Sequence, residues 1–249
     1  MQVLAIYNLK GGVGKTAASV NLAHIAAQAN IPTLLWDLDP QGASSWYFGQ
    51  ETGLKGMGKG LIKGKTPLAE FIHHTQFDNL DIIPANLENH QIEHWLKKSE
   101  KPRKQLRKLI EPLHEDYSLL ILDCPPGYSL LAENIMHAAD LIACPIIPTF
   151  LSIRTYAQIV GHQARAKIKD VKLHPFLSMI DRRRKLHREL EKDLPVMIKT
   201  LLPVSIPYAS VIEQMGEKRL PVTAFAHSSD AAQAYIDLWQ EIQKRLLKA

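Results

Sequence analysis

A glycine-rich turn between an apolar run and a helix-patterned stretch constrains this chain more than any other feature. Residues Lys10–Thr16 read KGGVGKT and follow the apolar run Val3–Ile6 directly. Gly11, Gly12 and Gly14 allow the positive φ values with which a backbone curls tightly around an anion. The N–H groups of such a turn, and those that open the next helix, point at phosphate oxygens. The sequence therefore predicts a strand, a phosphate-binding loop and a helix, in that order.

Two side chains of this turn suit a nucleoside triphosphate and its magnesium ion. Lys15 is placed to reach the β- and γ-phosphates, and the hydroxyl of Thr16 is placed to coordinate Mg²⁺. The general pattern for such loops asks for glycine five residues before Gly14, where this chain has Leu9 and then a second lysine, Lys10. A turn that merely happens to contain two lysines is the alternative, and the later motifs argue against it.

Strand-like and helix-like segments alternate along the chain. The predicted strands are Val3–Tyr7, Thr33–Trp36, Leu80–Ile83, Ser118–Leu122, Leu141–Ile147, Leu173–Ile180 and Leu201–Val204. Helical patterns cover Ala17–Ala29, Leu87–Lys98, Arg103–His114 and Ala231–Ile242, and a further helix is expected to begin with Thr66 as its N-cap and Pro67 as its first residue. This alternation predicts an α/β fold, a doubly wound and mostly parallel sheet with helices on both faces. Ligands of such sheets bind at the carboxyl ends of the strands.

Length and composition are those of one cytosolic domain. The 249 residues contain no low-complexity linker and no repeat, so residues 1–249 are expected to form a single domain. The longest apolar stretch, Leu141–Leu151, is broken by two prolines and is too short to span a bilayer, and no signal peptide precedes the first strand. Cys124 and Cys144 lie in apolar runs, which favours buried, reduced thiols over a disulfide or a metal site.

The net charge is +5, and the positive charge is clustered. Residues Lys97–Lys108 carry a net charge of +6, and the run Arg182–Lys185 is followed closely by Arg188. Such clusters are typical of polyanion binding, and a solvated helix face is the alternative for each. Residues Gly53–Lys65 hold five glycines and four lysines, so they form either a plain surface loop or a loop that closes over a phosphate.

Aspartates follow two of the predicted strands. Asp123 closes a continuous apolar strand, a position typical of a carboxylate that holds Mg²⁺ through its water shell; a turn or N-cap aspartate is the alternative. Asp37 and Asp39 end the second strand, and the alternation of a strand places one of them on the nucleotide side. Phosphoryl transfer depends mostly on positioning and charge neutralisation, so these groups need no strong base beside them.

Together these motifs resemble the ParA/MinD family of P-loop ATPases, whose phosphate loop is a deviant Walker A motif. The resemblance lies in KGGVGKT, in DLDPQ from Asp37, in DCPPG from Asp123, in AAD at 138–140 and in SMIDR from Ser178. It covers the chain from residue 2 to about residue 247 without an added helix-turn-helix domain. The chain is therefore similar to the short, single-domain ParA proteins.

The resemblance implies roles for individual residues. Lys10 would contact the phosphates of the partner's ATP in a nucleotide-sandwich homodimer, and Asp39 would orient the attacking water; with Lys15 these are the predicted catalytic residues. The predicted metal site is Thr16, Asp37 and Asp123. The predicted nucleotide-binding residues are Lys10, Gly11, Gly12, Val13, Gly14, Lys15, Thr16, Ala17, Met179, Asp181 and Pro207. The expected cofactors are ATP and Mg²⁺.

A function follows from the same resemblance. ATP binding would drive dimerisation, the dimer would bind DNA without sequence preference, and a ParB-like or other adaptor would stimulate hydrolysis, so that a plasmid, chromosome region or protein assembly is partitioned or positioned. Such a protein would be cytoplasmic and associated with the nucleoid. The expected DNA contacts are Arg182, Arg183, Arg184, Lys185, Arg188, Lys218 and Arg219.

The chain departs from the family's pattern at three places, and other functions stay open. Ala17 replaces a second threonine, Tyr208 stands where many relatives have arginine, and His227–Asp230 lacks an arginine that relatives use on DNA. The alternatives are a MinD-like membrane-associated ATPase, a metabolic P-loop ligase, and a scaffold that uses ATP only to dimerise. The cysteine positions do not suit an iron–sulfur reductase. Nothing in the sequence names the cargo or the activating partner.

Overall fold

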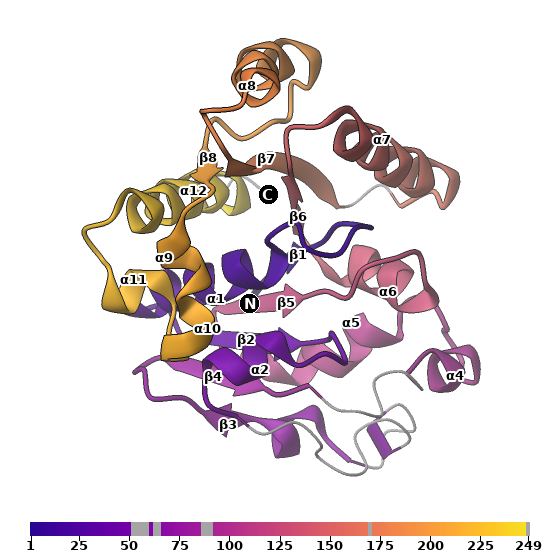
Figure 1. The fold of residues 1–249 in the computed structure, drawn as a ribbon. Coiled ribbons are helices and arrows are strands. Elements are labelled where there is room, and N and C mark those ends of the chain that lie inside the picture. Colours follow the sequence, from indigo (N-terminus) through magenta and orange to yellow (C-terminus); the bar gives the residue numbers. More distant parts are fainter. Residues whose placement is uncertain (51–59, 62–65, 86–91, 169–170, 248–249) are drawn as a thin grey trace.

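Eight strands form one sheet in the computed structural model, which describes residues 1–50, 60–61, 66–85, 92–168 and 171–247 (Figure 1). The strands are β1 (Gln2–Ile6), β2 (Thr33–Asp37), β3 (His73–His74), β4 (Leu80–Ile83), β5 (Leu119–Asp123), β6 (Leu141–Ile146), β7 (Lys172–Ile180) and β8 (Ser205–Pro207). Their order across the sheet is β3-β4-β2-β5-β1-β6-β7-β8. Every neighbouring pair is parallel except β3 and β4. The predicted fold class is confirmed.

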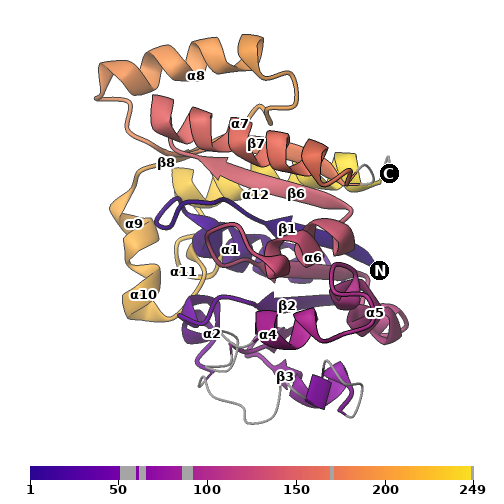
Figure 2. The ribbon, with the colours of Figure 1, turned by 90° about the vertical axis from the view of Figure 1, so that its right-hand side faces the viewer.

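Helices cover both faces of the sheet (Figure 2). The α-helices are α1 (Lys15–Gln28), α2 (Ala43–Tyr47), α4 (Ile92–Lys97), α5 (Gln105–Ile110), α6 (Leu130–Ala138), α7 (Phe150–Arg165), α8 (Lys185–Met197), α9 (Ser210–Glu213), α10 (Met215–Lys218), α11 (Val222–Phe225) and α12 (Asp230–Leu246). Short 3₁₀ helices span Leu68–Phe71 and Glu111–His114 in the described part of the chain. Residues of α1, α11 and α12 pack on one face, and residues of α4, α5, α6 and α7 pack on the other.

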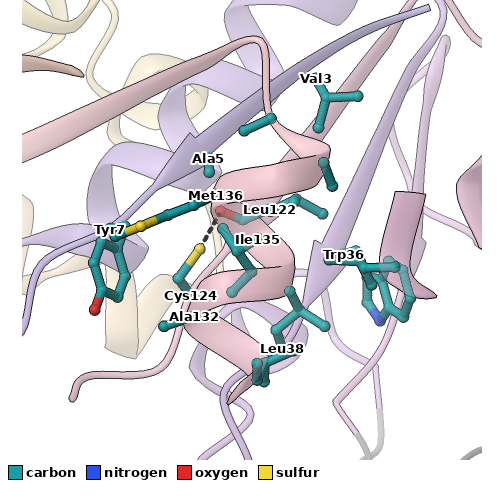
Figure 3. Close-up of a cluster of buried hydrophobic side chains, with 14 of the residues drawn as sticks. Val3, Ala5, Tyr7, Trp36, Leu38, Leu122, Cys124, Ala132, Ile135 and Met136 are labelled. Carbon is teal, nitrogen blue, oxygen red and sulfur yellow. Dashed lines mark hydrogen bonds between the residues drawn. The ribbon is translucent and has the colours of Figure 1, made fainter. Parts of the chain in front are cut away.

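Strand β1 shows how the sequence divides between these two cores. Leu4 and Ile6 belong to the core that α1 and α12 complete. Val3, Ala5 and Tyr7 belong to the opposite core, where they lie among side chains of α6 (Figure 3). Because successive strand side chains point to opposite faces, a strand buried on both sides is apolar throughout. The continuous apolar runs in the sequence are therefore the central strands.

The boundaries of two helices differ from the prediction. Helix α1 begins at Lys15, two residues earlier than predicted, because Gly14 is its N-cap. The helix predicted for Arg103–His114 is divided into α5 and a 3₁₀ turn in which Pro112 occupies one of the first two positions. Helix α4 falls within the predicted Leu87–Lys98, but residues 86–91 lie outside the described residues.

Two local predictions were wrong, and one strand was missed. No strand forms over Leu201–Val204, because Pro203 has no N–H to donate; only the N–H of Leu202 bonds to β7, and the paired strand β8 begins at Ser205. Thr66 does not cap a helix, since Pro67 is the cap of a single 3₁₀ turn. The antiparallel edge strand β3 was not predicted, since two histidines carry no strand pattern.

The predictions for the cysteines hold in the structure. Cys124 and Cys144 are both buried and unbonded to each other. The thiol of Cys124 donates to the carbonyl oxygen of Leu122 at 3.3 Å, as Figure 3 shows. Burial raises the pKa of both thiols. Among the helices in the described residues, none combines the length and the apolar character needed to cross a membrane.

Candidate nucleotide and metal site

The phosphate loop joins β1 to α1 in the middle of the sheet. Gly12 and Gly14 have φ values of 68° and 90°, so both take the left-handed conformation that the sequence predicted for an anion-binding turn. A Cβ on Gly14 would lie 2.8 Å from Oγ of Ser178, whereas one on Gly11 or Gly12 would meet nothing within 4 Å. Gly14 is therefore required for close packing against β7, whereas Gly11 and Gly12 face open space.

The two lysines of the loop have different surroundings. Lys15 is buried, and its Nζ donates to the carbonyl oxygen of Lys10 at 3.0 Å. Asn8 fixes the start of the loop, since its Oδ1 accepts from the N–H of Lys10 at 3.0 Å and its Nδ2 donates to the carbonyl oxygen of Pro145 at 2.7 Å. The ammonium of Lys10 forms no ion pair with any residue that the structure describes. Lys10 thus keeps an uncompensated charge at the mouth of the loop.

Two buried carboxylates lie side by side at the carboxyl ends of β2 and β5. Asp37 and Asp123 are partners in the register of these strands, and neither is exposed. Burial and the neighbouring Asp123 raise the pKa of Asp37 to about 7. Burial likewise raises the pKa of Asp123. A pair of buried, mutually repelling carboxylates favours a bound cation.

Hydroxyl groups surround Asp123. Ser19 donates to its Oδ1 at 3.0 Å, Ser44 donates to its Oδ2, and the side chain of Thr16 is also hydrogen-bonded to it. These oxygen ligands suit Mg²⁺, which binds proteins through one or two carboxylates and completes its shell with water and substrate phosphates. No group of three His, Cys, Asp or Glu residues is gathered for a metal in the described part of the chain, and Mg²⁺ needs no such group. The predicted residues Thr16, Asp37 and Asp123 therefore come together and fit this ion.

Asp39 lies just beyond β2, partly exposed, on the loop that leads to α2. Its N–H donates to Oδ1 of Asp37 at 3.2 Å, and its Oδ1 accepts from the N–H of Gln41 at 3.0 Å. The loop therefore holds the Asp39 carboxylate at the same edge of the sheet as the phosphate loop. Its predicted role in orienting water stays a prediction.

The residues predicted to lie beside the base are at the carboxyl ends of β7 and β8. Asp181 and Pro207 line a groove of about 740 Å³ that also includes Tyr208 and Glu213. Met179 has a φ of 57° at an irregularity of β7, and it follows the residue that touches Gly14. Ala17 is half-buried in α1. The predicted contacts of these residues with a nucleotide stay a prediction.

The carboxylate of Asp181 forms an ion pair within the protein. The guanidinium of Arg183 donates to both of its carboxylate oxygens, at 2.8 and 3.0 Å, and this ion pair lowers the pKa of Asp181 to about 2. At the rim of the groove, the hydroxyl of Tyr208 donates to Glu213 at 3.1 Å. The tyrosine that replaces the family's arginine therefore makes a contact with the last residue of α9.

The residues predicted to contact DNA fall into two groups. Arg182 is paired with Glu191 at 3.3 Å, Lys185 lies 3.7 Å from Glu189, and Arg188 donates to backbone oxygens of Arg182 and Arg183. In this first group Arg184 is exposed and has no ion-pair partner among the described residues. The first group therefore has less uncommitted charge than its sequence suggests.

The second group, Lys218 and Arg219, packs on aromatic rings. The ammonium of Lys218 is 5.5 Å from the ring centroid of Phe225, and the guanidinium of Arg219 is 3.5 Å from that of Trp46. In Figures 1 and 2, α10 lies far from α8, so the two groups occupy separate parts of the surface. The divergent segment His227–Asp230 has a structural role, since Ser229 caps α12 by accepting from the N–H of Ala232.

The basic segment Lys97–Lys108 is different, because most of its charge is unpaired. Of its seven basic residues only Arg103 forms an ion pair within the described residues, with Glu133 at 3.0 Å. Lys98 lies over the ring of Trp95 at 5.5 Å. Most of the Gly53–Lys65 loop lies outside the described residues.

Sequence reasoning missed the serines and Asn8. Ser19, Ser44 and Ser45 all donate to the buried aspartates. The position of Ser44 and Ser45, shortly after the DLDPQ motif, is a signal that could have indicated them. Asn8 precedes the phosphate loop and had no comparable signal.

Comparisons with known proteins agree with this geometry. The model of the AAA domain family matches residues 1–175. The chain is 30% identical to the chromosome partitioning protein ParA of Caulobacter vibrioides, with 98% of this chain and 95% of that protein covered. This chain is a member of the ParA/MinD family of P-loop ATPases.

Two further relatives support the assignment. ParA of Myxococcus xanthus, also named a chromosome partitioning protein, is 28% identical over 98% of this chain and 88% of its own length. The solved structure of Cyanothece McdA, an aspartate-to-alanine variant in complex with ATP, superposes with a TM-score of 0.86 at 18% identity and covers 98% of this chain and 96% of that one. This likeness shows that the two proteins share a fold.

Proposed function

We propose that this ParA-type protein is an ATPase switch that dimerises around ATP, binds DNA without sequence preference and partitions or positions a cargo. The observation that carries the proposal is Lys10. Its ammonium has no ion-pair partner in the described residues, although it stands beside an open phosphate loop. A charge held in this way is suited to the phosphates of a second subunit's nucleotide, as an arginine finger supplied in trans would be.

The site residues would divide the chemistry of ATP hydrolysis among them. Lys15 and the loop N–H groups bind the phosphates, and Thr16, Asp37 and Asp123 hold Mg²⁺, which neutralises charge that develops on the transferred phosphoryl group. Asp39 orients the water. Because both buried aspartates are already hydrogen-bonded to serines, they are pre-positioned before any ligand arrives. The turnover of the protein alone is expected to be weak and to rise with an activating adaptor.

Exposed apolar side chains favour a second subunit on the same edge of the sheet. Tyr128 follows β5 and is 47% exposed, while Phe150 and Leu151 follow β6 and are 69% and 65% exposed. Both segments come after the carboxyl ends of strands adjacent to β1, which carries the phosphate loop. Exposed apolar side chains at the edge of the sheet that carries the phosphate loop suit a homodimer interface that closes over the nucleotide.

DNA binding would use the uncommitted charge of the surface. Arg184, Lys218 and Arg219 are exposed, and Lys97–Lys108 adds a third basic region. Nonspecific binding of this kind needs only phosphate contacts, so it falls steeply with salt. The cargo could be a plasmid, a chromosome region or a protein assembly, and the protein would then be cytoplasmic and nucleoid-associated.

The membrane and ligase alternatives are less well supported. Helix α12 buries its apolar side chains Tyr235, Leu238, Trp239, Ile242 and Leu246 in the core, so they are not available to a lipid surface. A metabolic ligase would show ATP turnover that depends on a small acid and not on DNA, whereas a non-hydrolysing scaffold would show no turnover at all.

The proposal is tested by the mass of the protein in light scattering. Asp39→Ala is expected to trap a dimer with ATP and to stay monomeric with ADP. The double variant Lys10→Ala, Asp39→Ala is expected to bind ATP as a monomer, because the trans contact is lost. A dimer that forms equally well without Lys10 would contradict the assigned role of this lysine.

A further inference from the structure

Two consecutive serines of α2 hold the two buried carboxylates. Ser44 donates its hydroxyl to Oδ2 of Asp123. Ser45 donates both its N–H, at 2.9 Å, and its hydroxyl, at 2.7 Å, to Oδ2 of Asp37. Both serines are completely buried. The position of α2 is therefore tied to the position of both carboxylates.

Trp46, the next residue of the same helix, makes contacts at the protein surface. Trp46 is 48% exposed, and its Nε1 donates to the carbonyl oxygen of Gly216 in α10 at 3.2 Å. The guanidinium of Arg219 lies 3.5 Å from the centroid of the Trp46 ring, a cation–π contact. Arg219 is among the residues that the sequence predicted to contact DNA. Three consecutive residues thus connect the carboxylate site with a surface cation.

The helix between these contacts is short, and a glycine lies close to each of its ends. It contains only the five residues Ala43–Tyr47. Gly42 precedes it with a φ of 66°, and Gly49 follows it with a φ of 67°. Glycines in this conformation change their backbone angles at small cost, so α2 can move as a unit.

The hydrogen bonds of Asp123 explain how metal binding at this carboxylate would move α2. Ser19 holds Oδ1 of this carboxylate at 3.0 Å, and Ser44 holds Oδ2, so both oxygens are occupied by hydroxyl groups. Ser19 belongs to α1, which also carries the phosphate-binding Lys15, whereas Ser44 belongs to the short α2. When Asp123 turns an oxygen toward a metal shell, Ser44 must share or release it.

We propose that α2 couples the carboxylate site to the Lys218–Arg219 surface: Ser44 and Ser45 position Asp123 and Asp37, and Trp46 releases Arg219 and α10 when these carboxylates serve a bound nucleotide and its Mg²⁺. This coupling rests on the proposed ATP site. Ser44 and Ser45 are positioning residues in this account. Residues that position a metal ligand by hydrogen bonds change metal affinity by roughly 10- to 100-fold when they are removed.

The contact between α2 and α10 can be followed by fluorescence. A Cβ on Gly216 would meet nothing within 4 Å, so Gly216→Cys fits there, and the two native cysteines are fully buried and thus protected from labelling. Bimane attached at this position lies beside Trp46, which quenches it on contact. The quenching that disappears in Trp46→Phe measures the closed state of α2 on α10. The unaltered chain, treated with the same reagent, reports any label on the native thiols.

The expected result has two parts. In the nucleotide-free protein, Ser45→Ala loses two hydrogen bonds of its hydroxyl, the one to Asp37 and the one from the N–H of Ala85, and it is expected to shift the closed-to-open equilibrium at least about fivefold toward open. Ser45→Thr, which keeps the hydroxyl, is expected to restore the closed state. Ser19→Ala is the control, because it removes a serine hydroxyl bond to the neighbouring carboxylate, Asp123, from α1 and not from α2, and it is expected to leave the quenching unchanged. In the intact chain, a non-hydrolysable ATP analogue with Mg²⁺ is expected to lower the quenching.

Other results would overturn the coupling. These are quenching that Ser45→Ala leaves unchanged, a loss of quenching in Ser19→Ala as large as in Ser45→Ala, or quenching that the bound analogue leaves unchanged. Binding of the analogue is measured in the same samples with a fluorescent nucleotide. If no nucleotide binds, the proposed ATP site fails, and the serine variants without nucleotide still decide whether α2 links the carboxylates to α10.

Discussion

Protonation of His24 should limit the stability of the protein in mild acid. His24 lies on the buried side of α1, the helix that also carries Lys15. One ring nitrogen is 2.8 Å from Oγ1 of Thr223 in α11, and the ring stacks edge-on against Phe77 at 4.6 Å. Burial lowers the pKa of His24 from 6.5 to about 4. The folded protein therefore resists a proton that the unfolded chain accepts.

The size and sign of the effect follow from this shift. Above pH 6.5 the imidazole is neutral in both states and has no effect on the pH dependence of stability. As the pH falls from 6.5 to 4, only the unfolded chain takes up the proton, so the free energy of unfolding decreases. A shift of 2.5 pH units corresponds to a loss of about 3 kcal/mol by pH 4.

The assay is urea unfolding of the protein and of His24→Gln between pH 7.5 and 4.5. The free energy of unfolding of His24→Gln is expected to fall less steeply with decreasing pH, with a difference that approaches about 3 kcal/mol at the lower limit. His227→Gln is the matched control, because His227 is exposed. Parallel pH profiles for the intact chain and His24→Gln would refute the reasoning.

Further predictions concern the phosphate loop and a helix cap. Lys15→Ala is expected to abolish ATP binding, measured by titration with a fluorescent nucleotide, because its ammonium is the buried cation of the loop; retained affinity would contradict this. Gly14→Ala is expected to lower the free energy of unfolding by about 1–2 kcal/mol from its φ of 90° alone, with more from the 2.8 Å approach to Ser178, and to weaken nucleotide binding; an unchanged melting temperature would argue against it. Ser229→Ala removes the N-cap of α12 and is expected to cost about 1 kcal/mol in unfolding free energy without changing nucleotide affinity.

The central strands and the phosphate loop were predictable because each depends on local sequence. Strand Leu80–Ile83 was predicted with its observed limits, and β1 differs by one residue at each end, since a doubly buried strand is apolar throughout. The loop conformation follows from its glycines. Contacts between distant segments were not predictable in this way. The bond of Ser44 to Asp123 joins residues 79 positions apart, and the stacking of Arg219 on Trp46 joins residues 173 positions apart. No local sequence pattern predicts contacts of this kind.

Surface charge shows the same limit. The run Arg182–Lys185 is strongly basic in sequence, yet Arg182 and Arg183 are paired with acids in the structure. One of these acids, Glu191, comes from the next turns of α8, and the other, Asp181, is adjacent in sequence. A count of basic residues overestimates the charge that is available to DNA, because the pairing depends on side-chain geometry. The strand predicted at Leu201–Val204 does not form for a different reason, because Pro203 has no N–H to donate and interrupts the hydrogen bonds to β7.

The most direct test of the central claim is retention of Asp39→Ala on immobilised random-sequence duplex DNA, with ATP and with ADP, across a salt series. The account predicts that ATP retains the protein at low salt, that ADP does not, and that retention falls steeply as salt rises. If Asp39→Ala binds ATP and dimerises but ATP and ADP give the same retention, or none, the claim that ATP switches this protein onto DNA would be contradicted.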